Sequence, residues 1–304
     1  FIIGHWRSGT TYLHNILCQD PQMGYVTTYQ SVFPENMFRG FGKWLFKSFM
    51  KMAIPVSRKG DNVKLGVEYP QEEEFALGSK YNCSFYHFWF FPEKTLDYYM
   101  QYVLFEGNSQ RTKNNFIKAY NRLIIKALVY HKKDIFISKN PPNPGRIPVL
   151  LEMYPNARFI HIYRNPVTVI LSTRNFFEMM MPYLQFHSID KEVLENNIFM
   201  IHENMMQKMF EDISLIPSDN LVEINFEEFE QDPFPIIEKI YDQLRIPDFE
   251  GSKDNFKSYI LSRKGYQKNN YSITASELEH IKKRCFFTMK KWGYGTPDHI
   301  DIIS

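Results

Sequence analysis

The chain has 304 residues, of which 44% are hydrophobic, and this is enough to bury the core of one large domain. Its 36 basic and 34 acidic residues leave a formal net charge of +2, so no global field favours nucleic acid as a partner and any anion site must be local. The three cysteines, Cys18, Cys83 and Cys285, lack the spacing of a zinc site or a disulfide framework, which predicts a reducing, cytoplasmic location.

Short apolar runs alternate with helical patterns along the chain. Four runs bounded by turn or proline signals predict buried strands: residues 1–3, 135–138, 159–163 and 221–224. Helical patterns are found at residues 11–18, 114–130, 148–153, 167–180, 192–213 and 235–244. This alternation predicts an α/β fold with a P-loop-like parallel sheet and helices on both faces. Since the chain opens directly on a core-like strand without methionine, we expect further residues before Phe1.

Residues 4–11 (GHWRSGTT) have the glycine spacing of a nucleotide phosphate loop and lie between a predicted strand and a predicted helix. Backbone amides and hydroxyls in such a loop can surround a phosphate at the start of the helix. Thr10 occupies the position of the lysine of a nucleoside triphosphatase, and Arg7 lies inside the loop. The loop therefore suits one phosphate and predicts no metal ion.

The segment Arg7-Ser8-Gly9-Thr10-Thr11 resembles the (K/R)-S-G-T-T loop of the sulfotransferase superfamily, most closely that of bacterial members with an H-W-R-S-G-T-T sequence. The resemblance implies transfer of a sulfuryl group from 3'-phosphoadenosine-5'-phosphosulfate (PAPS), with 3'-phosphoadenosine 5'-phosphate (PAP) as product. It implies that Ser8, Gly9, Thr10 and Thr11 hold the 5'-phosphate, while the guanidinium of Arg7 faces the transferring sulfonate.

A second cation ends the predicted strand at residues 159–163. Arg164 is followed by Asn165 and Pro166, and Ser172 lies eight positions after Arg164 in a predicted helix, so both side chains can face one anion. In sulfotransferases an R-(N/D)-P motif with serine at this spacing binds the 3'-phosphate, and the resemblance gives this role to Arg164 and Ser172. A lone arginine at a strand end would more simply pair with a surface carboxylate.

Three further segments resemble the family. Residues 138–142 (SKNPP) are similar to the segment with a lysine after the second strand, which implies that Lys139 neutralises the departing group. Arg263-Lys264-Gly265 is similar to a triplet that covers the 3'-phosphate, although an exposed basic loop is an equal alternative. Residues 222–233 resemble a strand and the helix that follows it in the family, a match that implies a structural and not a catalytic role.

A hydroxyl acceptor must lose a proton, but asparagine and prolines follow Lys139 where cytosolic relatives carry a histidine. Residues 70–77 (PQEEEFAL) resemble a P-x-E-(D/E)-E-F motif of bacterial sulfotransferases. We predict that one of its three glutamates is the general base, with Glu73 and Glu74 the leading choices and His87 the reserve. The segment predicts a helix that starts near Pro70, and stabilisation of its dipole would select the same three carboxylates.

Residues 37–52 carry Arg39, Lys43, Lys47 and Lys51 at intervals of four, with apolar side chains over much of the remaining surface. The pattern predicts a cationic amphipathic helix, which either packs on the core with a solvated basic edge or makes peripheral contact with a membrane. Together with the aromatic residues 85–91, it favours an apolar acceptor such as a lipid, a sterol or an aromatic alcohol.

Residues 31–110 lack the strand and helix alternation, and we interpret them as an insertion that covers the active site within one domain, residues 1–304. Two alternative functions remain open. A P-loop kinase acting on a small metabolite would be expected to carry the missing loop lysine and to require Mg²⁺. A non-catalytic nucleotide-binding module would leave Lys139 without a purpose.

Overall fold

The computed structural model describes residues 1–35, 40–53, 66–107, 110–263 and 270–303. Its centre is a parallel sheet with the strand order β1-β4-β5, in which Ile2 pairs with Ile160 and Ile160 with Val222. The strands are β1 (Ile2–Ile3), β4 (Phe159–Tyr163) and β5 (Leu221–Asn225). The sequence prediction is confirmed for all three strands.

A second parallel pair extends this sheet beyond β1. It consists of β2 (Met23–Gly24) and β3 (Ile135–Phe136). The amide of Ile2 donates to the Ser138 carbonyl over 2.8 Å, and Ile2 forms a parallel bridge with Lys139. The chain after β3 therefore runs beside β1, and Lys139 lies next to the strand that leads into the phosphate loop.

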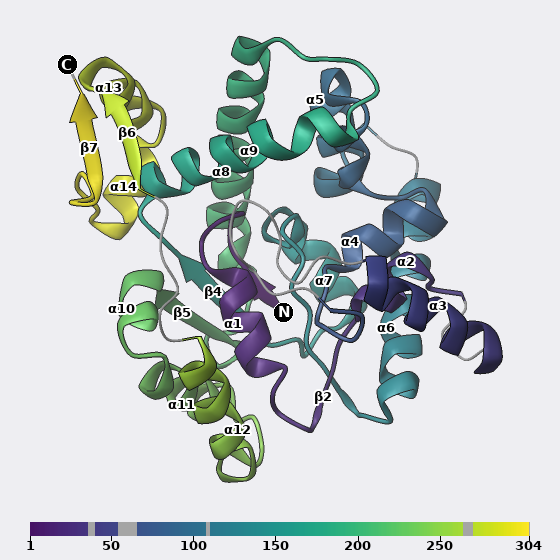
Figure 1. Cartoon of the computed structure of the whole chain (residues 1–304). Helices are drawn as coiled ribbons and strands as arrows, with labels where there is room; N and C mark the ends of the chain where they lie inside the picture. The colour runs from purple at the N-terminus through teal and green to yellow at the C-terminus, as the bar shows by residue number, and fades with distance from the viewer. Residues whose placement is uncertain (36–39, 54–65, 108–109, 264–269, 304) are drawn as a thin grey trace.

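Side chains of the central strands alternate between two apolar clusters, one on each face of the sheet. Ile3 and Phe159 belong to one cluster, whereas Ile2, Ile160 and Ile162 belong to the other. The first face is covered by α6 (Gln110–His131), α7 (Ile147–Met153), α8 (Pro166–Leu184) and α9 (Lys191–Asp212). The second is covered by α1 (Thr10–Leu17), α11 (Pro233–Gln243) and α12 (Phe249–Ser262). Figure 1 shows the resulting layers, which confirm the predicted α/β fold.

Residues 31–110 are largely helical where the structure describes them, without a strand among those residues. The elements of this region and its approach are α2 (Thr28–Val32), α3 (Gly40–Ala53), α4 (Glu73–Ala76) and α5 (Thr95–Tyr99), with tight or wide helical turns at Leu77–Tyr81, Phe85–Trp89, Pro92–Lys94 and Met100–Leu104. The rings of Phe85 and Phe88 are fully buried and stack on each other at 4.7 Å between centroids.

The segment at residues 222–233 forms β5, α10 (Phe226–Gln231) and the start of α11, as the sequence predicts. The C-terminal region adds α13 (Ala275–Arg284), α14 (Phe286–Trp292) and a separate parallel pair, β6 (Tyr271–Thr274) and β7 (Ile300–Ile303). Short 3₁₀ turns lie at Asn143–Arg146, Ile213–Leu215 and Ser218–Asn220. Among the described helices, none combines the length and apolar character needed to cross a membrane.

Candidate active site

The phosphate loop connects β1 to α1, and its conformation requires glycine at position 9. Gly9 has a φ of 92°, and a Cβ there would lie 2.1 Å from the ring of Phe226. The backbone then enters α1, whose first amides have no acceptor within their own helix and can bind an anion. Ser8 and Thr10 are buried at this helix start.

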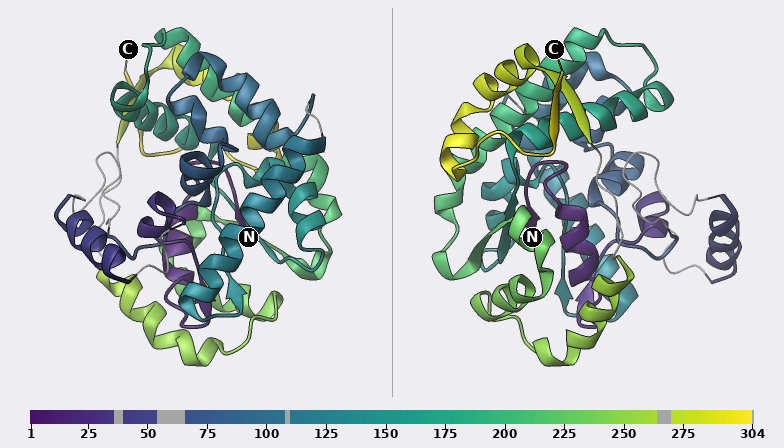
Figure 2. Two further views of the ribbon diagram at one scale, coloured as in Figure 1. Left: turned by 90° about the vertical axis from the view of Figure 1, so that its right-hand side faces the viewer. Right: turned by 60° about the vertical axis from the view of Figure 1, so that its left-hand side comes forward.

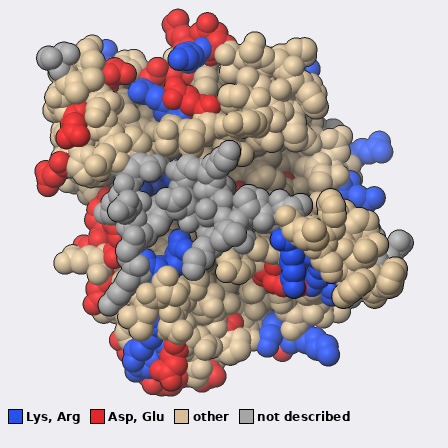
Figure 3. Space-filling model, viewed as in Figure 1, with Lys and Arg blue, Asp and Glu red and all other residues tan. Residues whose placement is uncertain are grey.

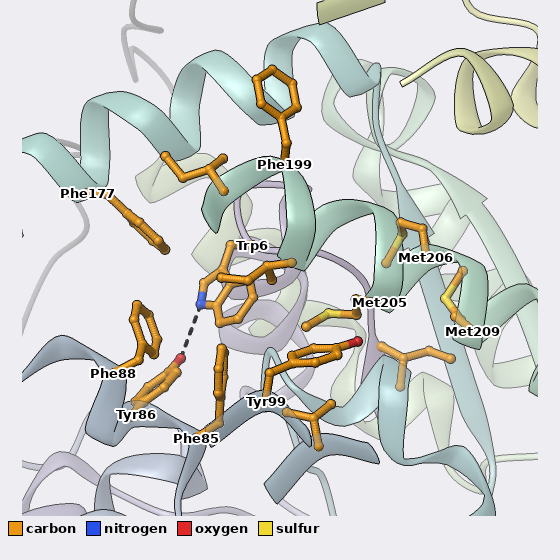
Figure 4. Packing of buried hydrophobic residues seen from close by; sticks show 14 of the residues in the cluster. Trp6, Phe85, Tyr86, Phe88, Tyr99, Phe177, Phe199, Met205, Met206 and Met209 are labelled. Carbon is orange, nitrogen blue, oxygen red and sulfur yellow. Dashed lines mark hydrogen bonds between the residues drawn. The ribbon is translucent and has the colours of Figure 1, made fainter. Parts of the chain in front are cut away.

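The loop is anchored by Trp6, which is buried in the large apolar cluster drawn in Figure 4. Its indole Nε1 donates to the hydroxyl of Tyr86 over 3.3 Å, and its ring contacts Phe85 at 5.9 Å between centroids. Because Tyr86 lies in the aromatic region after α4, this contact ties the phosphate loop to residues far away in the sequence.

The structure brings Arg7, Arg164 and Ser172 together, and their role in binding a cofactor stays a prediction from the sequence. Arg7 Nε donates to Ser172 Oγ over 2.9 Å, and Arg164 Nη1 donates to the Arg7 carbonyl over 3.2 Å. The guanidinium of Arg164 also lies 4.4 Å above the ring of Phe226, the residue that fixes Gly9. Two cations are thereby placed at the N-terminus of α1, where a doubly phosphorylated ligand would be stabilised.

A small cavity of about 10 Å³ lies at the same end of the sheet. Ser8 and Arg164 line it together with His5 and His202. Burial lowers the pKa of His5 to about 4 and that of His202 well below its usual value, so both imidazoles are neutral at physiological pH. The Arg164 guanidinium adds a positive charge to this lining.

Lys139 is almost completely buried, and its ammonium is paired with a carboxylate. Its Nζ lies 2.5 Å from Glu72 Oε1, and Glu72 Oε2 accepts a hydrogen bond from the Tyr86 hydroxyl over 2.5 Å. Since Tyr86 also accepts from Trp6, a continuous chain of contacts runs from the phosphate loop to Lys139. The sequence placed Lys139 correctly after the second strand but did not predict Glu72 as its partner.

The leading candidates for the general base, Glu73 and Glu74, are both fully buried. Helix α4 begins at Glu73 and not near Pro70, so Glu72 lies outside the helix and points in a different direction from the two that follow. Glu74 accepts from Arg146 Nη1 at 2.7 Å and Nη2 at 3.0 Å and from Asn140 at 2.7 Å. Burial would raise its pKa, but the charge and hydrogen bonds of Arg146 lower the pKa of Glu74 overall.

Glu73 differs from Glu74 because, among the residues that the structure describes, no cation lies within hydrogen-bond distance of it. Its Oε2 accepts from Tyr120 over 3.1 Å and from Ser138 over 2.9 Å, and its buried Oε1 has no hydrogen-bond partner in the described part of the chain. Burial raises the pKa of Glu73 to about 7. A role for Glu73 or Glu74 as the base stays a prediction from the sequence.

His87 and Arg263, two further predicted residues, lie beside tyrosine side chains. His87 packs against the rings of Tyr98 and Tyr102, at 5.6 Å and 6.1 Å between centroids. Arg263 is the C-cap residue of α12 and lies near Tyr12 of α1. Burial raises the pKa of Tyr12 to about 12, although the charge of Arg263 acts to lower it. Lys264 and Gly265 lie outside the described residues.

Arg146 is the site-adjacent residue that the sequence analysis missed. It is the largest fully buried side chain among the described residues. It donates from Nε to the Tyr102 carbonyl, and its guanidinium lies 4.6 Å from the centroid of the Phe116 ring. It follows a proline and a glycine in a short turn, where no periodicity marks a residue as buried. The three consecutive glutamates at residues 72–74 could have indicated a buried arginine, because a buried carboxylate needs a cationic partner.

The chain is similar to known proteins of one family. A family model described as "Sulfotransferase family" matches residues 1–251. The omega-hydroxy-beta-dihydromenaquinone-9 sulfotransferases Stf3 of Mycobacterium bovis and Mycobacterium tuberculosis are each 26% identical to the chain over 294 residues, which is 97% of this chain and 74% of theirs.

Two crystal structures share the fold. Sulfotransferase STF9 from Mycobacterium avium aligns with a TM-score of 0.69 at 15% identity, covering 96% of this chain and 76% of that one. Sulfotransferase STF1 from Mycobacterium tuberculosis aligns with a TM-score of 0.70 at 14% identity, covering 93% and 75%. Because the family model matches most of the chain, the protein belongs to the sulfotransferase family and is a transferase, which removes the kinase and binding-module alternatives.

Proposed function

We propose that the protein transfers a sulfuryl group from PAPS to a hydroxyl group of an apolar acceptor. The contact between Arg7 and Ser172 carries this proposal, because it joins the loop suited to a 5'-phosphate to the residues suited to a 3'-phosphate. PAPS is implied by the family and carries an anionic group for each half. Transfer without a divalent metal ion remains a prediction from the loop sequence.

The residues present fit such a ligand. Ser8, Gly9, Thr10 and Thr11 would bind the 5'-phosphate with amides and hydroxyls at the start of α1, and Arg7 would face the sulfonate. Arg164 and Ser172 would bind the 3'-phosphate, and Arg263, Lys264 and Gly265 would cover it. Every one of these groups can donate a hydrogen bond to an oxyanion, and the arginines add charge.

In the proposed reaction, the acceptor oxygen attacks sulfur in line with the bond to the bridging phosphate oxygen. The new bond between the acceptor oxygen and sulfur forms as the bridging bond breaks, and PAP leaves with the electron pair. Arg7 and Lys139 would stabilise the charge that develops on the sulfonate and on the leaving oxygen. A carboxylate near Lys139 would receive the proton of the acceptor.

Removing the guanidinium of Arg164 should abolish discrimination between PAP and AMP. The parent protein is expected to bind PAP more tightly than AMP, and Arg164→Ala should lose on the order of 1.5–3 kcal/mol of PAP affinity while AMP affinity changes little. Calorimetric titration of both nucleotides measures this. Arg245→Ala is the matched control, since Arg245 is an exposed arginine paired with Asp219. Equal affinities of the parent for PAP and AMP would contradict the cofactor assignment.

An apolar acceptor is supported by aromatic rings between the two ends of the site. The guanidinium of Arg7 lies 5.4 Å from the Phe176 ring, Phe176 contacts Trp89 at 5.7 Å, and Trp89 contacts Tyr86 at 6.4 Å. Tyr86 in turn reaches Glu72, the partner of Lys139. An aromatic wall therefore connects the two cations proposed to flank the sulfuryl group, and residues 31–110, which supply part of it, would cover the acceptor. The Stf3 relatives are named for a hydroxylated menaquinone, an acceptor of the same apolar class.

Helix α3 supports contact with a membrane surface from which such an acceptor could be taken. Its inner side carries Met50, packed with Tyr29 and Val67, and Lys43, whose ammonium lies 4.0 Å from the centroid of the Tyr130 ring. Its outer side exposes a continuous row of apolar side chains, with Phe41 77% and Met52 89% exposed; the others are Trp44, Leu45 and Phe49. Figure 2 (right) shows α3 at the edge of the molecule.

The lysines of α3 are closer to the protein than the sequence predicts. Lys43 and Lys47 turn toward Tyr130, and Lys47 also pairs with Glu68, so they do not form a fully solvated edge. Lys51 remains exposed beside the apolar row. On the face drawn in Figure 3, charges of both signs are interspersed, so attraction to an anionic surface would be local to this helix. Arg39 lies outside the described residues.

The triple variant Phe41→Ser, Trp44→Ser, Phe49→Ser should bind lipid vesicles about tenfold or more weakly than the parent, because it removes the apolar area that would enter the interface. Co-sedimentation with phosphatidylcholine vesicles, with and without phosphatidylglycerol, measures the effect. Substituting serine for the exposed Leu215 and Ile302 is the control. If the parent protein does not sediment with either vesicle, the apolar row does not bind membranes. If the parent protein is a dimer and the triple variant is a monomer, the apolar row is a dimer interface.

A further inference from the structure

We propose that Glu72, and not its two neighbours, accepts the proton of the acceptor hydroxyl, and that Tyr86 is the positioning residue that aims its carboxylate. This inference rests on the proposed sulfuryl transfer. It assigns the base from the contacts that each of the three glutamates makes.

Of the three glutamates, Glu72 contacts Lys139 directly and the phosphate loop through Tyr86. Its Oε1 contacts the ammonium of Lys139, which lies beside β1 through the bridge to Ile2. Its Oε2 contacts Tyr86, whose hydroxyl also accepts from Trp6, the residue immediately before Arg7. The carboxylate is therefore held between the cation proposed for the leaving group and the loop proposed for the phosphosulfate.

Glu72 also retains capacity to accept a proton. An ionised carboxylate has about four acceptor positions, and the Glu72 carboxylate uses one on each oxygen for Lys139 and Tyr86. Its side chain keeps 11% of its surface exposed, whereas the Glu74 side chain has none. An acceptor hydroxyl can approach Glu72 from this exposed side.

The two neighbours are committed to the core. The Glu74 oxygens accept from Arg146, Asn140, Ser84 and the amide of Phe85, and these bonds fill its acceptor positions. Glu73 is enclosed by Tyr120 and Ser138. Neither has an exposed oxygen that a bound acceptor could reach without opening the core.

Tyr86 positions Glu72 from within the aromatic region. Burial raises the pKa of Tyr86 well above its usual value, so the phenol stays protonated and continues to donate to Glu72. The Tyr86 ring is held edge-on by Phe75 at 5.1 Å between centroids and lies beside Trp6 at 6.4 Å. An apolar acceptor that lies along these rings would present its hydroxyl at the Glu72 carboxylate.

The proton and electrons balance in the proposed step. The acceptor O–H bond breaks toward Glu72, the oxygen forms its bond to sulfur, and the bond from sulfur to the bridging oxygen breaks with its electron pair remaining on PAP. Glu72 is left as a neutral carboxylic acid and returns its proton to water after release of the products. The Lys139 ammonium, no longer facing a carboxylate anion, can then neutralise the leaving phosphate oxygen.

The test compares acceptors of different acidity, because a base matters most for a hydroxyl that does not ionise by itself. Transfer of labelled sulfate from PAPS is measured to 1-dodecanol, to 4-nitrophenol in mildly alkaline buffer, and to water in the absence of other acceptor. Glu72→Gln should lower turnover with dodecanol and water by about 10²-fold or more, but should lower turnover with the readily ionised nitrophenol much less. PAP affinity should stay near the parental value.

Three further variants separate catalysis from folding. Glu72→Asp keeps a negative charge near Lys139 but withdraws the carboxylate by one methylene, so it should remain folded with lowered turnover on dodecanol. Tyr86→Phe should lower kcat for dodecanol less than Glu72→Gln while leaving the KM for PAPS unchanged. Glu152→Gln, which removes an exposed carboxylate paired with Lys113, is the matched control and should retain parental activity.

Equal losses with dodecanol and nitrophenol in Glu72→Gln would give Glu72 a purely structural role and overturn the inference. Near-parental turnover of Glu72→Gln, with a large loss in Glu73→Gln, Glu74→Gln or His87→Ala, would move the base to that residue. Failure of the parent protein to transfer sulfate to any of the three acceptors would instead overturn the proposed function, and with it the role of Glu72.

Discussion

Glu74→Gln is expected to destabilise the folded protein by about 3–5 kcal/mol, because it leaves a buried guanidinium without its counter-charge. Arg146 is 0% exposed, and the Glu74 carboxylate accepts hydrogen bonds from both of its terminal nitrogens, Nη1 and Nη2. A glutamine amide can accept one of these hydrogen bonds but cannot balance the charge. Equilibrium unfolding in urea, with the midpoint and slope fitted for parent and variant, measures the loss.

Glu73→Gln is the matched control, since it makes the same replacement of one carboxylate oxygen by an amide nitrogen at the adjacent, equally buried glutamate. The pKa of Glu73 is raised by burial to about 7, so the folded state binds its proton more tightly than the unfolded state does. Its contribution to stability is therefore present below about pH 4.5 and is lost as the pH rises through about 7. At pH 8 the neutral amide should be tolerated or slightly stabilising. A larger loss in Glu73→Gln than in Glu74→Gln would contradict the assignment of the ion pair.

The parts of the fold that were predictable are those in which a local pattern has one physical cause. Residues 159–163 are mostly apolar because both faces of β4 are covered, and the proline at position 166 marks the first turn of α8. The phosphate loop was predictable because its glycine and hydroxyl spacing has few other uses. The two-residue strand β2 is too short to show any alternation and was not predicted.

The partners of charged residues could not be derived from the sequence. The three consecutive glutamates look equivalent in the sequence, yet each has a different partner in the structure. Glu72 contacts Lys139, Glu73 contacts Ser138 and Glu74 contacts Arg146, and these partners lie 65 to 72 positions farther along the chain. Which glutamate meets which partner depends on the exact residue at which α4 begins. A shift of one residue turns a side chain by about 100° around a helix, and the predicted start near Pro70 differs from the observed start at Glu73.

The partners of the lysines in residues 37–52, a surface segment, could not be derived from its amphipathic pattern either. The periodicity predicts a helix, and α3 is present from residue 40. It does not determine which side faces the protein, since lysines can extend over aromatic rings as readily as into water. In the structure the rings of Tyr29 and Tyr130 lie under Lys47, and the apolar row is turned outward.

Lys139→Met is expected to lower the turnover of sulfuryl transfer by about 10²- to 10³-fold, because it removes a preorganised cation from the position where the leaving oxygen would gain charge. Methionine is similar in length to lysine but carries no charge. The Lys139 side chain is 4% exposed, so solvent cannot easily replace its ammonium. Single-turnover transfer from PAPS measures the chemical step, and Lys118→Met, on the exposed side of α6, is the control.

Loss of folding can be distinguished from loss of this cation by a second variant. Lys139→Met alone leaves the Glu72 carboxylate buried without its cation, so some loss of stability is expected. In the double variant with Glu72→Gln, both charges are absent, and the unfolding midpoint should recover toward the parental value because no unpaired charge remains. Transfer to an alcohol should nevertheless stay at the level of the less active single variant or below it. Recovery of turnover together with stability would mean that Lys139 serves folding alone, and turnover of Lys139→Met within a few-fold of the parent would exclude its role at the leaving oxygen.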